Sequence, residues 1–255
     1  MILFVFEGVK REPMLFKTIQ YLFFPNKNNQ IVCSFGNNIY QLYKEIERLK
    51  INGEDYSDIV SILKNKWKNN ENNPLKDVMN SDDFSEIYLF FDYDFQQHKL
   101  SLSEINQQVE EMLELFDNET ENGKLYINYP MIESIRYTKQ LPDAEYYKYT
   151  VTRADCKRFK NLANSFSSYP TLDFLLLNSK SKLEYIRNNW LFLKQQNVTK
   201  ANFLCTGHNE FPTNKFLVSQ QNVFAKQVEK YILEDDCRVS ILNSFPLFLY
   251  DYFGK

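Results

Sequence analysis

The stretch Ile87-Tyr88-Leu89-Phe90-Phe91-Asp92-Tyr93-Asp94 decides the fold that we predict for this chain. Five consecutive apolar or aromatic residues of high strand propensity end in two acids separated by one residue. A continuous apolar run of this length is typical of a strand buried on both faces, as in the middle of a parallel sheet. Carboxylates directly after such a strand would lie at the carboxyl edge of the sheet, where open α/β sheets bind their ligands. We therefore take this edge as the candidate active site.

A second acid follows a strand pattern at the start of the chain. The apolar run Ile2–Phe6 ends at Glu7, which precedes Gly8. If the two strands are neighbours, Glu7, Asp92 and Asp94 converge on one point. Three carboxylates in a small volume imply a bound hard cation, normally Mg²⁺ or Mn²⁺. The alternative, which the spacing leaves open, is that Glu7 caps the first helix and that the two aspartates lie in a solvated turn.

The rest of the first half alternates between helical and strand patterns. Helices are predicted at about 13–24, 39–49, 58–68 and 103–116, and further strands at 31–36 and 124–129. This alternation predicts an α/β fold with a mostly parallel sheet flanked by helices. Helical patterns dominate after residue 140, with short strands expected at 203–204 and 239–242 and helices at 153–167, 180–195 and 213–234. We therefore expect a catalytic domain at 1–140, and a mainly helical portion at 141–255 that extends or completes it.

Three further charged residues belong to the candidate site. Lys10 and Glu12 follow Gly8, and Glu133 follows the strand at 124–129 in Pro130-Met131-Ile132-Glu133-Ser134, where Pro130 is expected to begin a helix. On one interpretation Lys10 is a surface residue and the two glutamates complement helix dipoles. On the other, Lys10 contacts a phosphate or the transition state, and both glutamates assist the metal. The spacing alone favours the first interpretation for Lys10 and Glu12.

Composition and missing motifs exclude several classes of function. The formal charge of −3 gives no global basic field, and the four cysteines form no C-x-x-C pair, which argues against a zinc site or a disulfide framework. The chain has no Walker A motif and no dinucleotide fingerprint. We expect a reduced, cytoplasmic protein without a signal peptide or a membrane span.

The polar segment 25–30 is predicted to be a loop, and His98 and His208 are predicted to lie in turns. The basic and aromatic run from Tyr146 to Lys160 favours a solvated helix face over a nucleic-acid contact.

Taken together, these residues resemble the Toprim domain of topoisomerases, primases and several nucleases. In that family a Glu after the first strand and a D-x-D after a later strand bind a divalent metal, and Glu7, Asp92 and Asp94 match these positions. The segment Glu7-Gly8-Val9-Lys10-Arg11-Glu12-Pro13 resembles the E-G-x-K-x-E-P opening of RloB-like proteins. Pro130-Met131-Ile132-Glu133 resembles their later P-x-x-E element. The resemblance covers about the first 140 residues.

The resemblance implies a function in defence against phage. RloB-like and AbiL- or PARIS-type Toprim proteins are effectors encoded beside an ATPase, which implies a metal-dependent endonuclease that is held or triggered by a P-loop ATPase partner. RNA, including transfer RNA, is favoured over DNA as the substrate by analogy alone, and a homodimer is left open. A second hypothesis is a non-catalytic subunit whose Toprim-like sheet docks the ATPase. A third, a primase-like polymerase, is disfavoured because nothing after residue 140 resembles a nucleotide-binding module.

Overall fold

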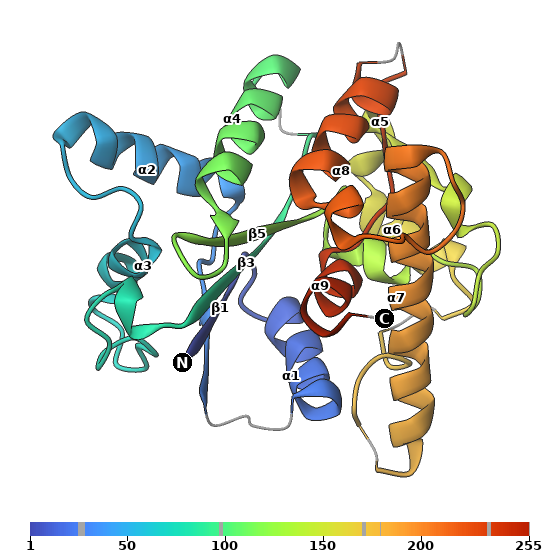
Figure 1. Ribbon diagram of the computed structural model, residues 1–255, viewed down its shortest axis with the longest axis horizontal. Coiled ribbons are helices and arrows are strands. Elements are labelled where there is room, and N and C mark those ends of the chain that lie inside the picture. The colour runs from blue at the N-terminus through green and yellow to red at the C-terminus, as the bar shows by residue number, and fades with distance from the viewer. Residues whose placement is uncertain (25–28, 97–98, 170–171, 179, 234–235, 255) are drawn as a thin grey trace. The chain divides into compact units, whose positions relative to one another are not determined.

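The strands predicted in the first half of the chain form one sheet. The computed structural model describes residues 1–24, 29–96, 99–169, 172–178, 180–233 and 236–254, and in these residues five strands pair in the order β2-β1-β3-β5-β4 (Figure 1). Their bounds are β1 Ile2–Phe6, β2 Gln30–Ser34, β3 Glu86–Asp92, β4 Asp117–Asn118 and β5 Gly123–Asn128. Strand β1 is parallel to β2 and to β3, and β4 is antiparallel to β5. The premise that the strand before Glu7 neighbours the strand before Asp92 is therefore confirmed.

The chain divides into two compact units. The first comprises Met1–Phe91 and Ser103–Tyr126, and the second comprises Asp92–Leu102 and Ile127–Lys255. The junctions fall inside β3 and β5, so each of these strands begins in the first unit and ends in the second. The predicted division of roles at residue 140 stays a prediction.

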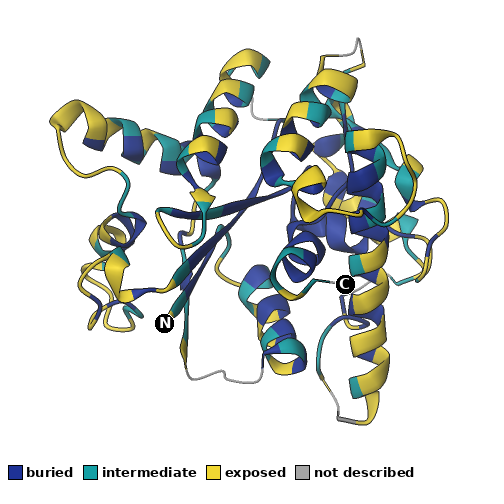
Figure 2. Cartoon of the chain, in the orientation of Figure 1, coloured by how far each residue is buried: buried dark blue, intermediate teal, exposed yellow. Residues whose placement is uncertain are grey.

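Amphipathic helices complete the first unit. They are α1 Arg11–Phe23, α2 Ile39–Asn52, α3 Ile59–Trp67 and α4 Leu102–Leu115, of which Leu102 belongs to the second unit. All four confirm the sequence pattern. Apolar residues of α4 at helical spacing are buried while its acids remain outside, and Figure 2 shows this alternation along the helices. Side chains cap the N-termini of α2 and α3. Asn38 Oδ1 accepts from the Gln41 N–H over 3.0 Å, and Asp58 Oδ1 accepts from the Val60 N–H over 2.9 Å.

An aromatic core fixes the register of β1 and β3. Phe6 pairs with Phe90 in the parallel ladder, and their ring centroids lie 5.3 Å apart. Phe90 also stacks on Tyr126 of β5 with centroids 5.4 Å apart. A slip of one residue would turn these rings to the opposite face of the sheet, so burial of large aromatic surface specifies where each strand ends.

The second unit is mainly helical. Its α-helices are α5 Arg153–Cys156, α6 Phe159–Phe166, α7 Leu183–Thr206, α8 Gln220–Gln227 and α9 Ser244–Phe253, and its two antiparallel strands are β6 Thr150–Thr152 and β7 Arg238–Ser240. A 3-10 helix spans Ile132–Arg136. Trp190 of α7 is fully buried, its indole N–H donates to the Leu175 carbonyl over 2.9 Å, and its ring meets Phe245 of α9 edge-on.

Several predictions for this half were wrong in detail. The strand expected at 203–204 is the last part of α7, which continues to Thr206 and ends at Gly207, where φ is 83°. Pro130 does not begin a helix, because the helix that contains Glu133 starts two residues later. The helix expected at 153–167 is divided into α5 and α6, and the one at 213–234 consists of a 3-10 turn at Lys215–Val218, α8 and a π-helical segment at Val228–Ile232.

The remaining expectations concern loops and membranes. The strand expected at 239–242 is confirmed as β7, which starts one residue earlier and ends two residues earlier than expected. His208 lies in an exposed turn after α7, as predicted, whereas His98 and most of the loop at 25–30 lie outside the described residues. Among the described helices, none combines the length and apolar character that a membrane span requires.

Candidate functional site

Glu7 lies at the carboxyl edge of the sheet. Its N–H donates to the carbonyl of Phe90 in β3 over 3.0 Å, and its carbonyl accepts from the N–H of Gly36, just after β2, over 2.8 Å. The backbone of Glu7 is thus bound on both sides by neighbouring strands. This pairing places the residue at the strand ends, where the sequence predicted it, and its side chain is half-buried.

Glu12 folds back over the turn that joins β1 to α1. The residue is only 5% exposed, and its Oε1 atom accepts from the N–H of Gly8 over 3.2 Å. A Cβ on residue 8 would lie 2.5 Å from Glu12 Oε2, so only glycine lets this carboxylate approach the turn so closely. Lys10 precedes α1, and its side chain is exposed.

Asp92 is held by a buried amide in the second unit. The Nδ2 group of Asn128 donates to Asp92 Oδ1 over 2.9 Å. Asn128 Oδ1 in turn accepts from the N–H of Ser244 over 2.9 Å and from its hydroxyl over 2.8 Å. Because two donors occupy the amide oxygen, the NH₂ group must face Asp92. Asp92 is 7% exposed and Asn128 1%, so the last residue of β3 presents a carboxylate in a fixed orientation.

Asp94 has an unusual backbone for a residue with a side chain. Its φ is 44°, in the left-handed region, and its N–H donates to the Pro130 carbonyl over 3.0 Å. The Oδ1 atom accepts from Gln96 Nε2 over 2.8 Å. Burial raises the pKa of the Asp94 carboxyl, and the Gln96 hydrogen bond and the charge of Lys160 oppose that rise. Strained backbone and a perturbed carboxyl together are a feature of functional sites.

Glu133 is the most buried of the candidate acids. It lies in the 3-10 helix Ile132–Arg136 and is 1% exposed. The Nζ atom of Lys160, the second residue of α6, lies 3.8 Å from Glu133 Oε1, while 66% of the lysine side chain is exposed. A buried carboxylate therefore has a cation close by that is itself in contact with water.

The six residues predicted for the site are divided equally between the two units. Glu7, Lys10 and Glu12 belong to the first unit, and Asp92, Asp94 and Glu133 to the second. Among the described residues, no three His, Cys, Asp or Glu side chains lie close enough together to hold a metal ion. The donor chemistry nevertheless suits Mg²⁺, which prefers carboxylate oxygens and keeps several waters, so that one or two carboxylates can bind it.

Sequence reasoning missed three residues of this region. Asn128 ends a strand as Asp92 does, and a polar residue after the apolar run Leu125–Ile127 was a usable signal. Gln96 follows Asp94 by two residues without a pattern that singles it out. Lys160 was part of a basic run interpreted as a solvated helix face, and only the fold shows that its ammonium group faces an acid.

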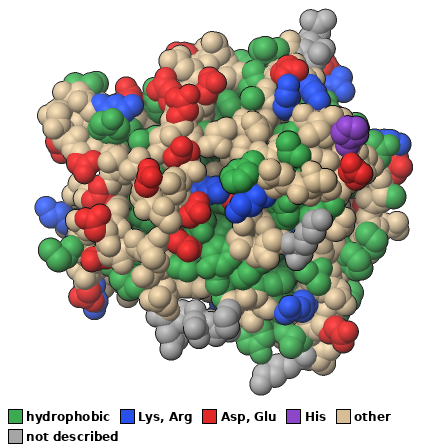
Figure 3. Space-filling view, viewed as in Figure 1, with side chains coloured by type: hydrophobic (Ala, Val, Ile, Leu, Met, Phe, Trp, Pro, Cys, Tyr) green, Lys and Arg blue, Asp and Glu red, His purple; other side chains and the backbone are tan. Residues whose placement is uncertain are grey.

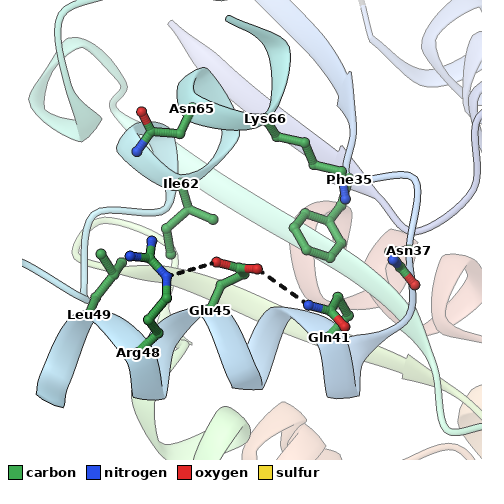
Figure 4. A pocket seen from close by; sticks show the side chains of 9 residues that line it. All are labelled: Phe35, Asn37, Gln41, Glu45, Arg48, Leu49, Ile62, Asn65 and Lys66. Atoms are coloured by element: carbon green, nitrogen blue, oxygen red, sulfur yellow. Dashed lines mark hydrogen bonds and ion pairs between the residues drawn. The ribbon is translucent and has the colours of Figure 1, made fainter.

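A pocket of about 400 Å³ lies in the first unit, just after the end of β2 (Figure 4). Phe35 and Asn37, which flank Gly36, line it together with residues of α2 and α3. Within it Glu45 accepts from Gln41 and from Arg48, each over 3.3 Å, and Lys66 Nζ lies 3.8 Å from the Phe35 ring centroid. The lining combines an aromatic ring, amides and both signs of charge, and it lies next to the edge at which the sequence predicts a ligand.

Comparisons with protein-family models, with curated proteins and with solved structures found no match. The Toprim resemblance therefore rests on the motifs of the sequence.

Proposed function

We propose that this chain is a metal-dependent endonuclease of Toprim type. The observation that carries the proposal is the anchoring of Asp92: its carboxylate ends β3, is buried, and is oriented by Asn128, whose own amide is fixed by Ser244. Strand β3 neighbours β1, which Glu7 follows. Any buried carboxylate needs hydrogen-bond partners, and a metal ligand in addition is held in one orientation by neighbours of this kind.

The proposed roles follow from donor chemistry. On the motif resemblance, Glu7, Asp92 and Asp94 are the proposed ligands of Mg²⁺ or Mn²⁺, of which one or two would bind the ion directly and the rest through water. Glu12 and Glu133 would assist by orienting water or an outer ligand. The metal, when bound, would activate water and stabilise the leaving oxygen of a phosphodiester. Lys10, which is exposed next to the turn, would neutralise charge on the phosphate.

The substrate and the partner are proposed from the sequence resemblance. RNA, with transfer RNA as one candidate, is favoured over DNA, and a P-loop ATPase is the proposed partner that holds or triggers the nuclease. The absence of a Walker A motif in this chain fits that division of labour. An anti-phage effector of this kind would be toxic when released.

Controlled expression tests the proposal. The wild type, Asp92→Asn and the control Asp117→Asn, which changes an exposed acid of β4, are each expressed with and without an adjacent ATPase gene, and the ends of cellular RNA and DNA are sequenced. We expect new ends that require Asp92 and are unaffected by Asp117→Asn. Identical end profiles for the wild type and Asp92→Asn in cells that restrict phage would refute a nuclease.

A docking subunit without catalysis is the second candidate. It is favoured by the acidic outer face of α4, where Glu104, Glu110 and Glu114 are exposed, and Figure 3 shows acidic side chains gathered over this helix. Such a face repels a nucleic acid and suits a basic protein surface. Calorimetric titration with Mg²⁺ separates the candidates, because a docking subunit need not bind the ion at physiological concentrations.

A further inference from the structure

Lys160 lies close to one buried acid of the second unit and acts electrostatically on another. Its Nζ atom is 3.8 Å from Oε1 of the buried Glu133. Its positive charge also acts on Asp94, where it favours the ionised carboxylate and opposes the effect of burial on the pKa. The two acids come from different segments, Asp94 after β3 and Glu133 after β5.

The base of this side chain is fixed by its surroundings. Phe159, the residue before it, is fully buried and stacks on Tyr137 with ring centroids 5.3 Å apart. The carbonyl of Lys160 accepts from Nη2 of the buried Arg136 over 3.3 Å. The backbone of Lys160 is therefore held at a defined point, from which its side chain reaches Glu133.

The end of the side chain is nevertheless free to change partners. A separation of 3.8 Å is longer than a charge-assisted hydrogen bond, and the lysine is 66% exposed, so water screens the pair. An ammonium group on a long flexible stem also loses little when it exchanges one oxygen anion for another. The geometry is that of a counter-ion that stays near the acids by charge alone.

We propose that Lys160 is a second phosphate-contacting residue of the candidate site, in addition to Lys10: in the free protein its ammonium group stays near Glu133, and on binding a nucleic acid it pairs with a phosphodiester oxygen. This inference rests on the proposed function and adds to it a contact that the sequence motifs do not contain. It has two consequences of opposite sign. Removing the charge should weaken nucleic-acid binding, and it should strengthen the binding of a divalent cation, because a like charge no longer opposes the ion.

The test uses charge removal with a matched control. Lys160→Met keeps the apolar stem, and Lys160→Arg keeps the charge. The control Lys157→Met removes an exposed lysine three positions earlier in the same basic run. Binding of a short fluorescein-labelled single-stranded RNA is measured by anisotropy over a range of KCl concentrations with EDTA present. Binding of Mn²⁺ is measured separately by calorimetry without nucleic acid.

We expect Lys160→Met to weaken RNA binding roughly tenfold and to reduce the slope of log affinity against log salt by about 0.7, the value of one phosphate contact on a single strand. It should tighten Mn²⁺ binding severalfold, and Lys160→Arg should restore RNA binding. Lys157→Met should change each quantity by less than half as much. Equal effects of the two Met variants, weaker Mn²⁺ binding by Lys160→Met, or a wild type that binds neither RNA nor DNA would each overturn the inference.

The outcome also separates this inference from the proposed function. If Asp92→Asn abolishes cleavage while Lys160→Met binds RNA like the wild type, the nuclease stands and the lysine contact is refuted. If the wild type binds RNA through Lys160 but cleaves nothing, the contact stands and the nuclease is refuted.

Discussion

The side-chain amide of Asn128 donates to Oδ1 of Asp92 over 2.9 Å, and both residues lie at the ends of strands. Ser244, the first residue of α9, holds the other side of that amide with its N–H and its hydroxyl. A hydrogen bond to a charged acceptor in a buried place is worth more than a neutral one, so its loss is costly. The relationship therefore governs both the stability of the second unit and the geometry of the proposed metal ligand.

Asn128→Asp should destabilise the protein by about 3 kcal/mol at neutral pH, because it sets a second buried carboxylate against Asp92 and removes the donor between them. One of the two carboxyls would then take up a proton at a raised pKa, so the loss should shrink as the pH falls. Urea unfolding at neutral and mildly acidic pH measures this. The control Asn164→Asp, on the exposed side of α6, should change the free energy of unfolding by less than about 0.5 kcal/mol. A loss that is independent of pH would contradict the pairing.

The backbone of Asp94 predicts an order of stabilities. Because its φ is 44°, a residue with a Cβ is strained there and glycine is not. Asp94→Gly should therefore be more stable than Asp94→Ala by about 1 kcal/mol, although glycine ordinarily destabilises a chain relative to alanine. Both variants lose the Gln96 hydrogen bond, so their difference isolates the backbone. Unfolding in urea measures it, and an alanine variant as stable as the glycine variant would show that residue 94 is not held in this conformation.

The raised pKa of Asp94 predicts a dependence on pH. Its folded pKa lies above the unfolded value of about 3.9, so between the two values the folded state binds more protons than the unfolded state. Stability must then fall as the pH rises through this window. Asp94→Asn removes the titration and keeps a residue that tolerates left-handed φ. With a chelator present, the Asp94→Asn variant should have the same free energy of unfolding as the wild type at low pH. Above the folded pKa of Asp94 it should be more stable than the wild type. A gap that closes with rising pH would refute the assigned direction.

The strands and their acids could be predicted because their signals are local. The apolar run Ile87–Phe91 and the acid that follows it are adjacent in the sequence. A continuous apolar run by itself indicates a strand buried on both faces, without knowledge of the strands beside it. Helix α9 gave no such signal, since seven of its ten residues are buried and no polar face marks a period. The strand predicted at Phe203 and Leu204 was wrong because the pattern there is too short. Two apolar residues fit a strand or a helix equally well, and the length of α7 decides between them.

The polar contacts of the site could not be predicted, because the fold creates them. Asn128 and Ser244 are 116 positions apart, and no spacing rule connects them. Lys160 approaches Glu133 from α6, which is separate from α5 although the sequence pattern predicted one helix there. Sequence patterns identify which residues carry charge, whereas packing decides which charges meet.

Gly8→Ala should displace the carboxylate of Glu12, because the new Cβ would lie 2.5 Å from Oε2 and 2.7 Å from Oε1. The side chain is flexible, so we expect a loss of only about 1 kcal/mol, the value of the hydrogen bond from the residue 8 N–H. A double-mutant cycle with Glu12→Ala tests this. With Glu12 truncated there is nothing to displace, so Gly8→Ala should then be nearly neutral. Additive losses would mean that the two residues are not coupled.

Gly123→Ala should destabilise the first unit by about 3 kcal/mol through two separate effects. Its φ of 115° strains any residue with a Cβ, and that Cβ would lie 2.8 Å from Leu89 Cδ1 and 3.0 Å from Ile87 Cγ2, both buried in β3. Gly207→Ala is the matched control, because its φ is also positive, 83°, but a Cβ there meets nothing within 4 Å. It should lose only the strain, about 1 kcal/mol. Urea unfolding of the two variants gives the difference, which measures how tightly β5 packs on the strand that ends in Asp92. Equal losses of unfolding free energy in the two variants would show that the side chain of Leu89 moves aside without destabilising β3.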